Sequence, residues 1–273
     1  MSAAAATSPT AEVAVIGGSG FYDFLADVTD VEVDTPYGRP SAPVAIGRLD
    51  DRPVAFLPRH GRSHAFPAHA VNYRANLWAL RSLGVRQVLA PCAVGSLRPS
   101  LGPGTFVVPD QLVDRTTSRV QTYYNAGACH VGFADPYCGR LRSHLLSTGQ
   151  RDGAELVDGG TMVVIEGPRF STRAESQWYA AQGWSLVNMT GHPEAVLARE
   201  LALCYAAVAL VTDLDAGVDA EHAVEQAEVF RVFGENTDRL RELLRDVVAT
   251  LSLDRSCACP HSLDGMRLPV QLP

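Results

Sequence analysis

Two carboxylic acids stand close together at the end of a predicted strand. Asp213 and Asp215 follow the apolar run 206–211, at a strand's carboxyl end, where open α/β sheets bind their ligands. Two acids in such a place shift each other's pKa, so that one can donate a proton while the other accepts a hydrogen bond. The pair indicates acid chemistry on a bound ligand; the alternative is two solvated loop acids.

A glycine-rich loop follows the first predicted strand, 12–16. Its residues 17–20 combine accessible backbone N–H groups with the hydroxyl of Ser19, a set that suits an oxyanion. A plain tight turn explains the glycines equally well. The loop does not match a dinucleotide-binding fingerprint, because Asp23 stands where a small residue is needed for helix–strand packing.

A second candidate anion site follows a strand near residue 58. Arg59 offers a planar fork suited to phosphate, and His60 can donate a hydrogen bond beside it. The spacing of His60, His64 and His69 could also suit a metal, but Pro67 interrupts any continuous helix that would align them. The anion is therefore the favoured interpretation of this segment.

Small residues end another predicted strand in the segment 90–98. Its members Cys92 and Ala93 predict a further nest of backbone N–H groups. The alternative is Cys92 as a nucleophile, which needs a neighbouring base to form the thiolate. Thr190 places a hydroxyl directly before a predicted helix and gives a further position for an oxyanion.

The segment 166–175 joins a predicted strand to a predicted helix. Phe170 could stack there on an aromatic ligand. Thr172, followed three residues later by Glu175, predicts a capping box at the start of the helix. The ligand and capping interpretations are compatible with each other.

The 273-residue chain contains no lysine, so all 23 basic residues are arginines, against 30 acidic residues and a formal net charge of −7. A Schiff base needs a primary amine and a Walker A loop needs its lysine, so both are excluded. The acidic balance argues against nucleic acid and anionic membranes as partners, and no apolar stretch approaches the length of a membrane span. An anionic ligand must be held by arginine, histidine, hydroxyls and backbone N–H groups.

The six cysteines are scattered through apolar or small-residue contexts, without the spacing of a secreted disulfide scaffold. They predict a reducing cytoplasm. Cys257 and Cys259, followed by His261, could bind a metal or form a short-loop disulfide. Because C-x-C is not a usual zinc spacing, no metal site is predicted.

The hydrophobic periodicity places these side chains on an α/β framework. We expect a single domain with a mostly parallel central mixed sheet flanked by helices, spanning 11–252, after a disordered tail, 1–10, and before a C-terminal extension, 253–273. The predicted strands are 12–16, 44–46, 54–57, 88–90, 105–108, 161–165, 186–187 and 206–212. The predicted helices are 71–83, 174–182, 193–204 and 223–251, the last with a break near Gly234.

In combination, these segments resemble the 5′-methylthioadenosine phosphorylase branch of the trimeric purine nucleoside phosphorylase family. The resemblance covers residues 12 to about 250, in order. It is carried by segments 16–20, 34–38, 59–61, 71–76, 95–98, 110–116, 166–175, 188–190 and 212–215.

The resemblance implies phosphorolysis of an N-glycosidic bond, in which inorganic phosphate attacks C1′ and a purine leaves. It implies a phosphate site made of Ser19, Arg59, His60, Cys92, Ala93 and Thr190. It places Met189 at the ribose, Phe170 against the purine, and Asp213, Leu214 and Asp215 at the N6/N7 edge, with Asp213, Asp215 and His60 as the catalytic residues. It requires neither a metal nor an organic cofactor, and it implies a cytoplasmic homotrimer, or a dimer of trimers, in methylthioadenosine salvage.

Two positions depart from the family. Cys92, a weaker donor, stands where members carry threonine. Gln226 falls where methylthio-specific members have an apolar residue in the 5′ pocket, and where hydroxyl-accepting relatives have a polar one. The expected specificity residues are Ser171, Gln226, Val229, Phe230 and His130, the last resembling a residue that a neighbouring subunit lends to this pocket.

The expected substrate is 5′-methylthioadenosine, which gives adenine and 5-methylthioribose 1-phosphate. Asp213 favours a 6-amino purine, because an ionised carboxylate accepts from the amino group and repels a 6-oxo oxygen. Gln226, His192 and a protonated form of Asp213 leave open a phosphorylase that acts on methylthioinosine, inosine or adenosine. An alternative of another class is a non-catalytic nucleoside-binding module built on the loop 17–20.

Overall fold

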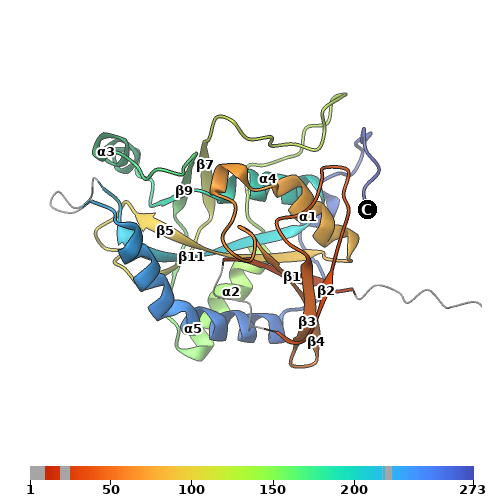
Figure 1. The fold of residues 1–273 in the computed structure, drawn as a ribbon, viewed down its shortest axis with the longest axis horizontal. Helices are drawn as coiled ribbons and strands as arrows, with labels where there is room; N and C mark the ends of the chain where they lie inside the picture. Colours follow the sequence, from red (N-terminus) through yellow and green to blue (C-terminus); the bar gives the residue numbers. More distant parts are fainter. Residues whose placement is uncertain (1–9, 19–24, 217, 219–222) are drawn as a thin grey trace, which may run out of the picture.

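The computed structural model describes residues 10–18, 25–216, 218 and 223–273. Its centre is an eleven-stranded mixed sheet in the order β2-β3-β4-β1-β5-β10-β9-β7, with β11, β6 and β8 branching from β5. The predicted α/β class, a central sheet flanked by helices, is confirmed (Figure 1). The strands are β1 (Val13–Gly17), β2 (Ala26–Val31), β3 (Val44–Leu49), β4 (Arg52–Pro58), β5 (Gln87–Ser96), β6 (Phe106–Val108), β7 (Gln111–Arg115), β8 (Leu156–Asp158), β9 (Thr161–Ile165), β10 (Leu186–Asn188) and β11 (Cys204–Leu214).

The sheet divides around β5. One edge of β5 pairs with β11 from end to end. On the other edge, β1 pairs in parallel with residues 87–89, and β10 pairs antiparallel with Gly95 and Ser96. β1 and β10 therefore run toward each other and stop short. Residues 90–94 of β5 are left without a neighbouring strand on that edge within the described chain.

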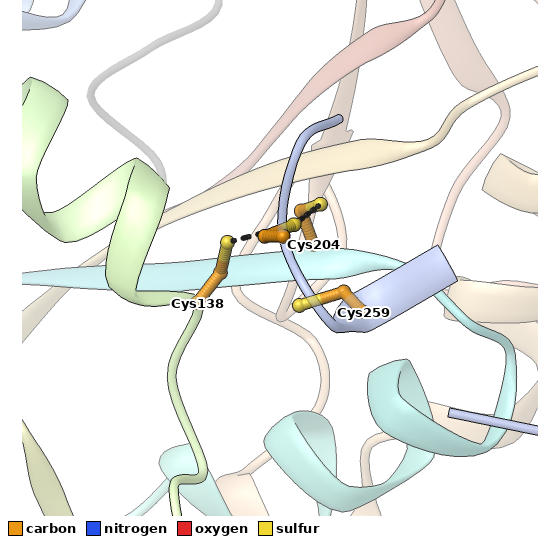
Figure 2. A group of neighbouring side chains, drawn as sticks. Cys138, Cys204 and Cys259 are labelled. Carbon is orange, nitrogen blue, oxygen red and sulfur yellow. Dashed lines mark hydrogen bonds between the residues drawn. The ribbon is translucent and has the colours of Figure 1, made fainter. Parts of the chain in front are cut away.

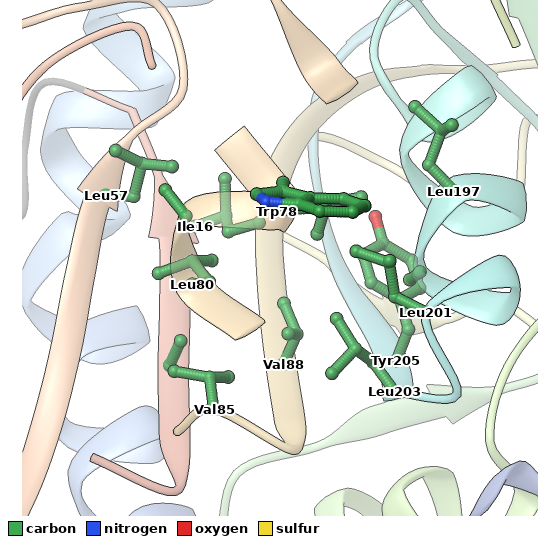
Figure 3. Close-up of a cluster of buried hydrophobic side chains, with 14 of the residues drawn as sticks. Ile16, Leu57, Trp78, Leu80, Val85, Val88, Leu197, Leu201, Leu203 and Tyr205 are labelled. Carbon is green, nitrogen blue, oxygen red and sulfur yellow. The ribbon is translucent and has the colours of Figure 1, made fainter. Parts of the chain in front are cut away.

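Helices cover both faces of the sheet (Figure 1). Alternate residues of β1 face opposite ways: Ala14 and Ile16 enter one buried cluster, and Val13 and Val15 enter another. A strand covered on both faces has no polar side, which explains its continuous apolar run. The first cluster, with Trp78, is shown in Figure 3. The helices α1 (Tyr73–Ser82) and α4 (Gly191–Glu200) cover this first cluster. The second cluster is covered by α2 (Gly139–Asp152) and α5 (Gln226–Thr250). The remaining helix, α3 (Arg173–Ala181), packs near the margin of the sheet beside β9.

Two predictions about helices are wrong, and one helix was not predicted. The predicted break near Gly234 is absent, because α5 runs unbroken and buries Leu240, Leu244 and Val247 against the sheet. The helix predicted to reach residue 204 ends at Glu200, and Cys204 already begins β11. The helix α2 was not predicted, since few of its residues are apolar.

The C-terminal extension packs onto the domain. Its apolar residues lie against the core beside α1 and α4, and Cys259, at the start of the short 3-10 helix η3 (Cys259–His261), is buried in the core on the other face. Residues 1–9 of the predicted disordered tail lie outside the described residues. Among the described helices, none is long and apolar enough to cross a membrane.

Replacing Gly234 by alanine should raise the free energy of unfolding by about 1 kcal/mol, because glycine disfavours a helix interior by about that amount. An added Cβ meets nothing within 4 Å there. The matched control is Gly183→Ala, at φ +80°, which should lower stability because a Cβ strains left-handed backbone. Chemical denaturation measures both. A Gly234→Ala chain no more stable than the original would contradict the unbroken helix.

Candidate active site

A cavity of about 440 Å3 opens at the gap between β1 and β10. Residues 91–95 of β5 line it, together with residues that follow the ends of the neighbouring strands. Its volume is typical of a small-molecule site. It brings together most of the predicted site residues, namely Arg59, His60, Cys92, Ala93, Phe170, Ser171, Met189, Thr190, Asp213, Asp215, Gln226, Val229 and Phe230.

Three predicted site residues are not in this lining. Leu214 alternates with Asp213 and Asp215 along the chain, so its side chain points to the other face of the strand. The structure therefore does not place the Leu214 side chain against a ligand. His130 is exposed and lies outside the cavity of its own chain. Ser19 lies outside the described residues.

Arg59 follows β4 and is only 3% exposed, so its charge must be satisfied inside the protein. Its Nε and Nη2 groups donate to the two carboxylate oxygens of Glu194, at 2.7 and 2.9 Å. Further N–H groups donate to the carbonyls of Ile16 and Pro91. The fork that the sequence assigned to phosphate is thus held by Glu194. Four of the five N–H groups are used within the described chain, which leaves one Nη1 hydrogen for a ligand.

His60 is a neutral acceptor. Burial, reinforced by the charge of Arg59, lowers the pKa of His60 to about 4. Its Nδ1 lies 2.8 Å from the carbonyl oxygen of Phe66, which assigns the ring hydrogen to Nδ1 and leaves Nε2 as an acceptor. The ring stacks on His64 with centroids 4.4 Å apart. Nε2 can accept from a protonated phosphate oxygen or a ribose hydroxyl.

Asn188 organises the turn between β10 and α4. Its Oδ1 accepts from the backbone N–H groups of Thr190 and Gly191, at 2.7 and 2.6 Å, and its Nδ2 donates to the carbonyl of Ala93. Two backbone N–H groups at the start of α4 are therefore already used. The Thr190 hydroxyl, 3.3 Å from the same Oδ1, is the group of this turn that can turn to an anion.

Cys92 lines the cavity as a neutral thiol. Burial raises its pKa to about 12, although the charge of Arg59 opposes the rise. So high a pKa disfavours a thiolate near neutral pH, and therefore argues against Cys92 as a nucleophile. What Cys92 can offer a ligand is a weak S–H donor, because its backbone N–H faces β11 whereas the backbone of Pro91 and Ala93 faces the opening.

A β-bulge at the end of β11 aims the two acids into the cavity. Val211 pairs with Val94 and Asp213 with Gly95, so Thr212 is an extra residue that shifts the register. Both carboxylates pack on Gly95. A Cβ there would lie 3.1 Å from Oδ1 of Asp213 and 3.3 Å from Oδ1 of Asp215. Any larger residue at position 95 would force the carboxylates to move.

The environment of these acids favours protonation. Burial raises the pKa of Asp213 to about 6, a hydrogen bond of 2.7 Å from the Thr212 hydroxyl opposes the rise, and the charge of Asp215 adds to it. Burial also raises the pKa of Asp215, and the neighbouring hydroxyls of Ser176 and Ser171 oppose the rise. Oδ2 of Asp215 is buried without a hydrogen-bond partner in the described chain. That oxygen is suited to carry a proton toward a ligand.

Met189 lies against the segment that precedes α3. A Cβ on Gly167, whose φ is +68°, would lie 2.7 Å from Sδ of Met189, so glycine is required there.

The predicted capping box at the start of α3 is confirmed: Thr172 Oγ1 accepts from the N–H of Glu175 at 3.2 Å, and the Glu175 carboxylate accepts from the N–H of Thr172 at 2.8 Å. It fixes the turn that carries Phe170 into the cavity.

The first turns of α5 form one wall of the cavity. Gln226, Val229 and Phe230 line it. Gln226 is exposed, and 52% of the surface of Phe230 is accessible. This wall is therefore open to solvent in the single chain.

Two residues that build the site, Glu194 and Asn188, were not predicted as site residues. Glu194 is a buried acid in the first turn of α4, and no local motif marks it as the partner of Arg59. His192, in contrast, is not in the cavity lining. Its Nε2 lies 2.7 Å from Oε1 of Gln121 and 3.2 Å from Asp114.

Comparisons with known proteins agree with this geometry. Residues 12–249 match the family described as the phosphorylase superfamily. The chain is 58% identical to a purine nucleoside phosphorylase of Streptomyces coelicolor, over 96% of this chain and 98% of the relative. It is 60% identical to an S-methyl-5′-thioadenosine phosphorylase of Mycobacterium tuberculosis, over 95% and 97%.

Solved structures are similar as well. A methylthioadenosine phosphorylase from an antarctic soil metagenomic library superimposes with a TM-score of 0.89 at 39% identity, covering 94% of this chain and 92% of that one. A methylthioadenosine phosphorylase of Schistosoma mansoni, in complex with adenine, gives a TM-score of 0.86 at 38% identity, with 90% and 93% covered. With a family match across most of its length, the chain belongs to the phosphorylase superfamily.

Proposed function

We propose that this protein cleaves the N-glycosidic bond of 5′-methylthioadenosine with inorganic phosphate, giving adenine and 5-methylthioribose 1-phosphate. The observation that carries the proposal is one cavity with groups for an anion at one end and two protonatable acids at the other. Arg59 donates to the carbonyl of Pro91, whereas the acids pack on Gly95. Four residues of strand span about 13 Å, a length that accommodates phosphate, sugar and base in a row.

At the anion end, phosphate is the nucleophile. One Nη1 hydrogen of Arg59, the Thr190 hydroxyl and the backbone N–H of Ala93 donate to its oxygens, and Nε2 of His60 accepts from a protonated one. As the bond from C1′ to the purine breaks, the sugar becomes positively charged. Phosphate held in line with that bond supplies the compensating charge and forms the new C1′–O bond.

At the other end, the purine leaves with the bonding electron pair. Protonation at N7 neutralises it, and an acid with a raised pKa can deliver that proton. We assign this role to Asp215, whose Oδ2 has no other partner in the described chain, and the acceptor of the 6-amino group to Asp213. The names of the 60%-identical and adenine-bound relatives support a 6-aminopurine. The reaction needs no metal and no organic cofactor.

A second candidate is a phosphorylase of nucleosides with a 5′-hydroxyl, such as adenosine or inosine. Gln226 favours it, because an amide in the cavity wall can hydrogen-bond a hydroxyl but not a thioether. The purine nucleoside phosphorylase among the relatives is consistent with it. The position of His192 outside the cavity removes one argument for a 6-oxopurine, whereas the raised pKa of Asp213 keeps the other, because a protonated Asp213 could donate to a 6-oxo oxygen.

We further propose a homotrimer in which His130 of a neighbouring subunit approaches the open wall formed by α5. The exposed Phe230 and Gln226 support this, since a 5′ pocket open to water on one side gives little shelter to an apolar substituent. The six free cysteines suit a cytoplasmic protein. Its products would serve methylthioadenosine and methionine salvage.

Turnover should depend on phosphate. In buffer in which sulfate replaces phosphate, release of adenine from 5′-methylthioadenosine should stop, because water lacks the charge that stabilises the sugar cation. With phosphate, 31P NMR should show a sugar 1-phosphate equal in amount to the adenine. Equal rates in the two buffers would contradict phosphorolysis and indicate a hydrolytic nucleosidase.

Asp215→Asn should lower kcat about a hundredfold or more, because the amide cannot deliver a proton to N7. Phosphate affinity, measured by calorimetry, should be retained, since the substitution lies at the other end of the cavity. The matched control is Asp254→Asn, an exposed acid outside the cavity, which should leave kcat unchanged. A near-normal kcat for Asp215→Asn would refute its role as the acid.

Gln226→Leu should shift the preference at the 5′ position. The ratio of kcat/KM for 5′-methylthioadenosine to that for adenosine should rise about tenfold, since the wall loses a hydrogen-bonding group and gains an apolar one. Glu242→Leu, on the exposed side of the same helix, serves as the control. If the ratio stays constant, Gln226 does not contact the 5′ substituent.

A further inference from the structure

Four of the six cysteines meet far from the active site. Cys138 precedes α2, Cys204 begins β11, and Cys257 and Cys259 lie in the C-terminal extension. Cys257 is 119 residues from Cys138 and 53 residues from Cys204 along the chain. The four sulfur atoms all lie within 4.8 Å of one another. Figure 2 shows the labelled Cys138, Cys204 and Cys259 converging from three separate segments.

The spacing of the sulfurs is that of ligands around a single ion. Sγ of Cys257 lies 3.5 Å from Sγ of Cys204 and 3.7 Å from Sγ of Cys138. A zinc–sulfur bond of about 2.3 Å in tetrahedral geometry places neighbouring sulfurs about 3.8 Å apart. All four cysteines are free, and three of them are buried.

We infer that Cys138, Cys204, Cys257 and Cys259 form a structural zinc site. Four thiolates in tetrahedral arrangement select zinc among the common divalent ions, because hard cations prefer oxygen ligands. Four protein ligands leave no open position for a substrate or a reactive water, so the site is structural and not catalytic. The C-x-C spacing alone did not predict it, because the other two ligands come from distant parts of the sequence.

The surroundings favour thiolates. Cys138 precedes the first turn of the 14-residue helix α2, where the helix dipole stabilises negative charge. Arg140 lies in the first turn of α2, in contact with the sulfurs of Cys204 and Cys257. Its Nε is buried without another partner in the described chain, so this cation can offset the negative charge of four thiolates.

The site joins the C-terminal extension to the start of β11. Asp213 and Asp215 lie at the opposite end of that strand. Zinc binding would therefore hold the extension against the domain and stabilise the fold, with no direct contact to the reaction. Its loss should lower the melting temperature more than it changes kcat.

The experiment measures zinc in the full-length chain, expressed without a histidine tag, purified under reducing conditions and passed through a desalting column. We expect about one zinc per chain by mass spectrometry, released in step with titration of thiols by a mercurial. Cys257→Ser should lose most of the zinc. Cys129→Ser, which removes a cysteine outside the cluster, should retain it.

A second measurement does not depend on the variants folding. Chain expressed with cobalt should show the strong visible d–d absorption of tetrahedral cobalt thiolate, and removal of metal by a chelator should lower the melting temperature until zinc is returned. A chain that is free of metal as isolated and takes up neither ion overturns the inference. So do non-reducing peptide maps that show the four cysteines paired as disulfides, or a Cys257→Ser chain with full zinc content.

Discussion

The buried ion pair of Arg59 and Glu194 is the interaction on which the site depends. Two charges removed from water are costly unless their hydrogen-bonding groups are satisfied, and here the framework itself satisfies every N–H group of Arg59 except one Nη1 hydrogen. Arg59 donates to carbonyls that end β1 and lie within β5, and Glu194 accepts from the hydroxyl of Tyr205 at 2.8 Å. The pair thereby links β1, β4, β5, β11 and α4 at one point. The buried pair thereby fixes the geometry at the anion end of the cavity.

The sheet supplies the second requirement, an opening. Most strands of a sheet bury their edges in the next strand, but β1 and β10 approach along one edge of β5 and leave its middle free. Backbone groups that would otherwise pair with a neighbour face the cavity instead, where a ligand can use them. The bulge at Thr212 completes the arrangement, because it turns both acids of β11 toward the same opening.

Much of this could be predicted from local sequence. Apolar runs identified the strands that carry the site, and the Thr172–Glu175 capping box was visible as a short motif. The partner of Arg59 could not be predicted, since Glu194 is 135 residues away and neither local sequence contains a motif that indicates the pairing. Gly234 suggested a break because glycine is a poor helix former, yet the burial of Leu240 and Leu244 outweighs that local preference. Helix α2 could not be predicted from hydrophobic periodicity, because Leu141 and Leu145 are the two leucines that it buries.

The open wall at the start of α5 has an evolutionary consequence. In the assembly that we propose, Gln226 and Phe230 would serve two selective pressures at once, discrimination of the 5′ substituent and affinity for the next subunit. A mutation that adapts the pocket to a new nucleoside would also alter the seam between subunits. Relatives with different substrates are then expected to differ on both sides of the subunit interface. Substrate preference and subunit contacts would therefore change together during evolution.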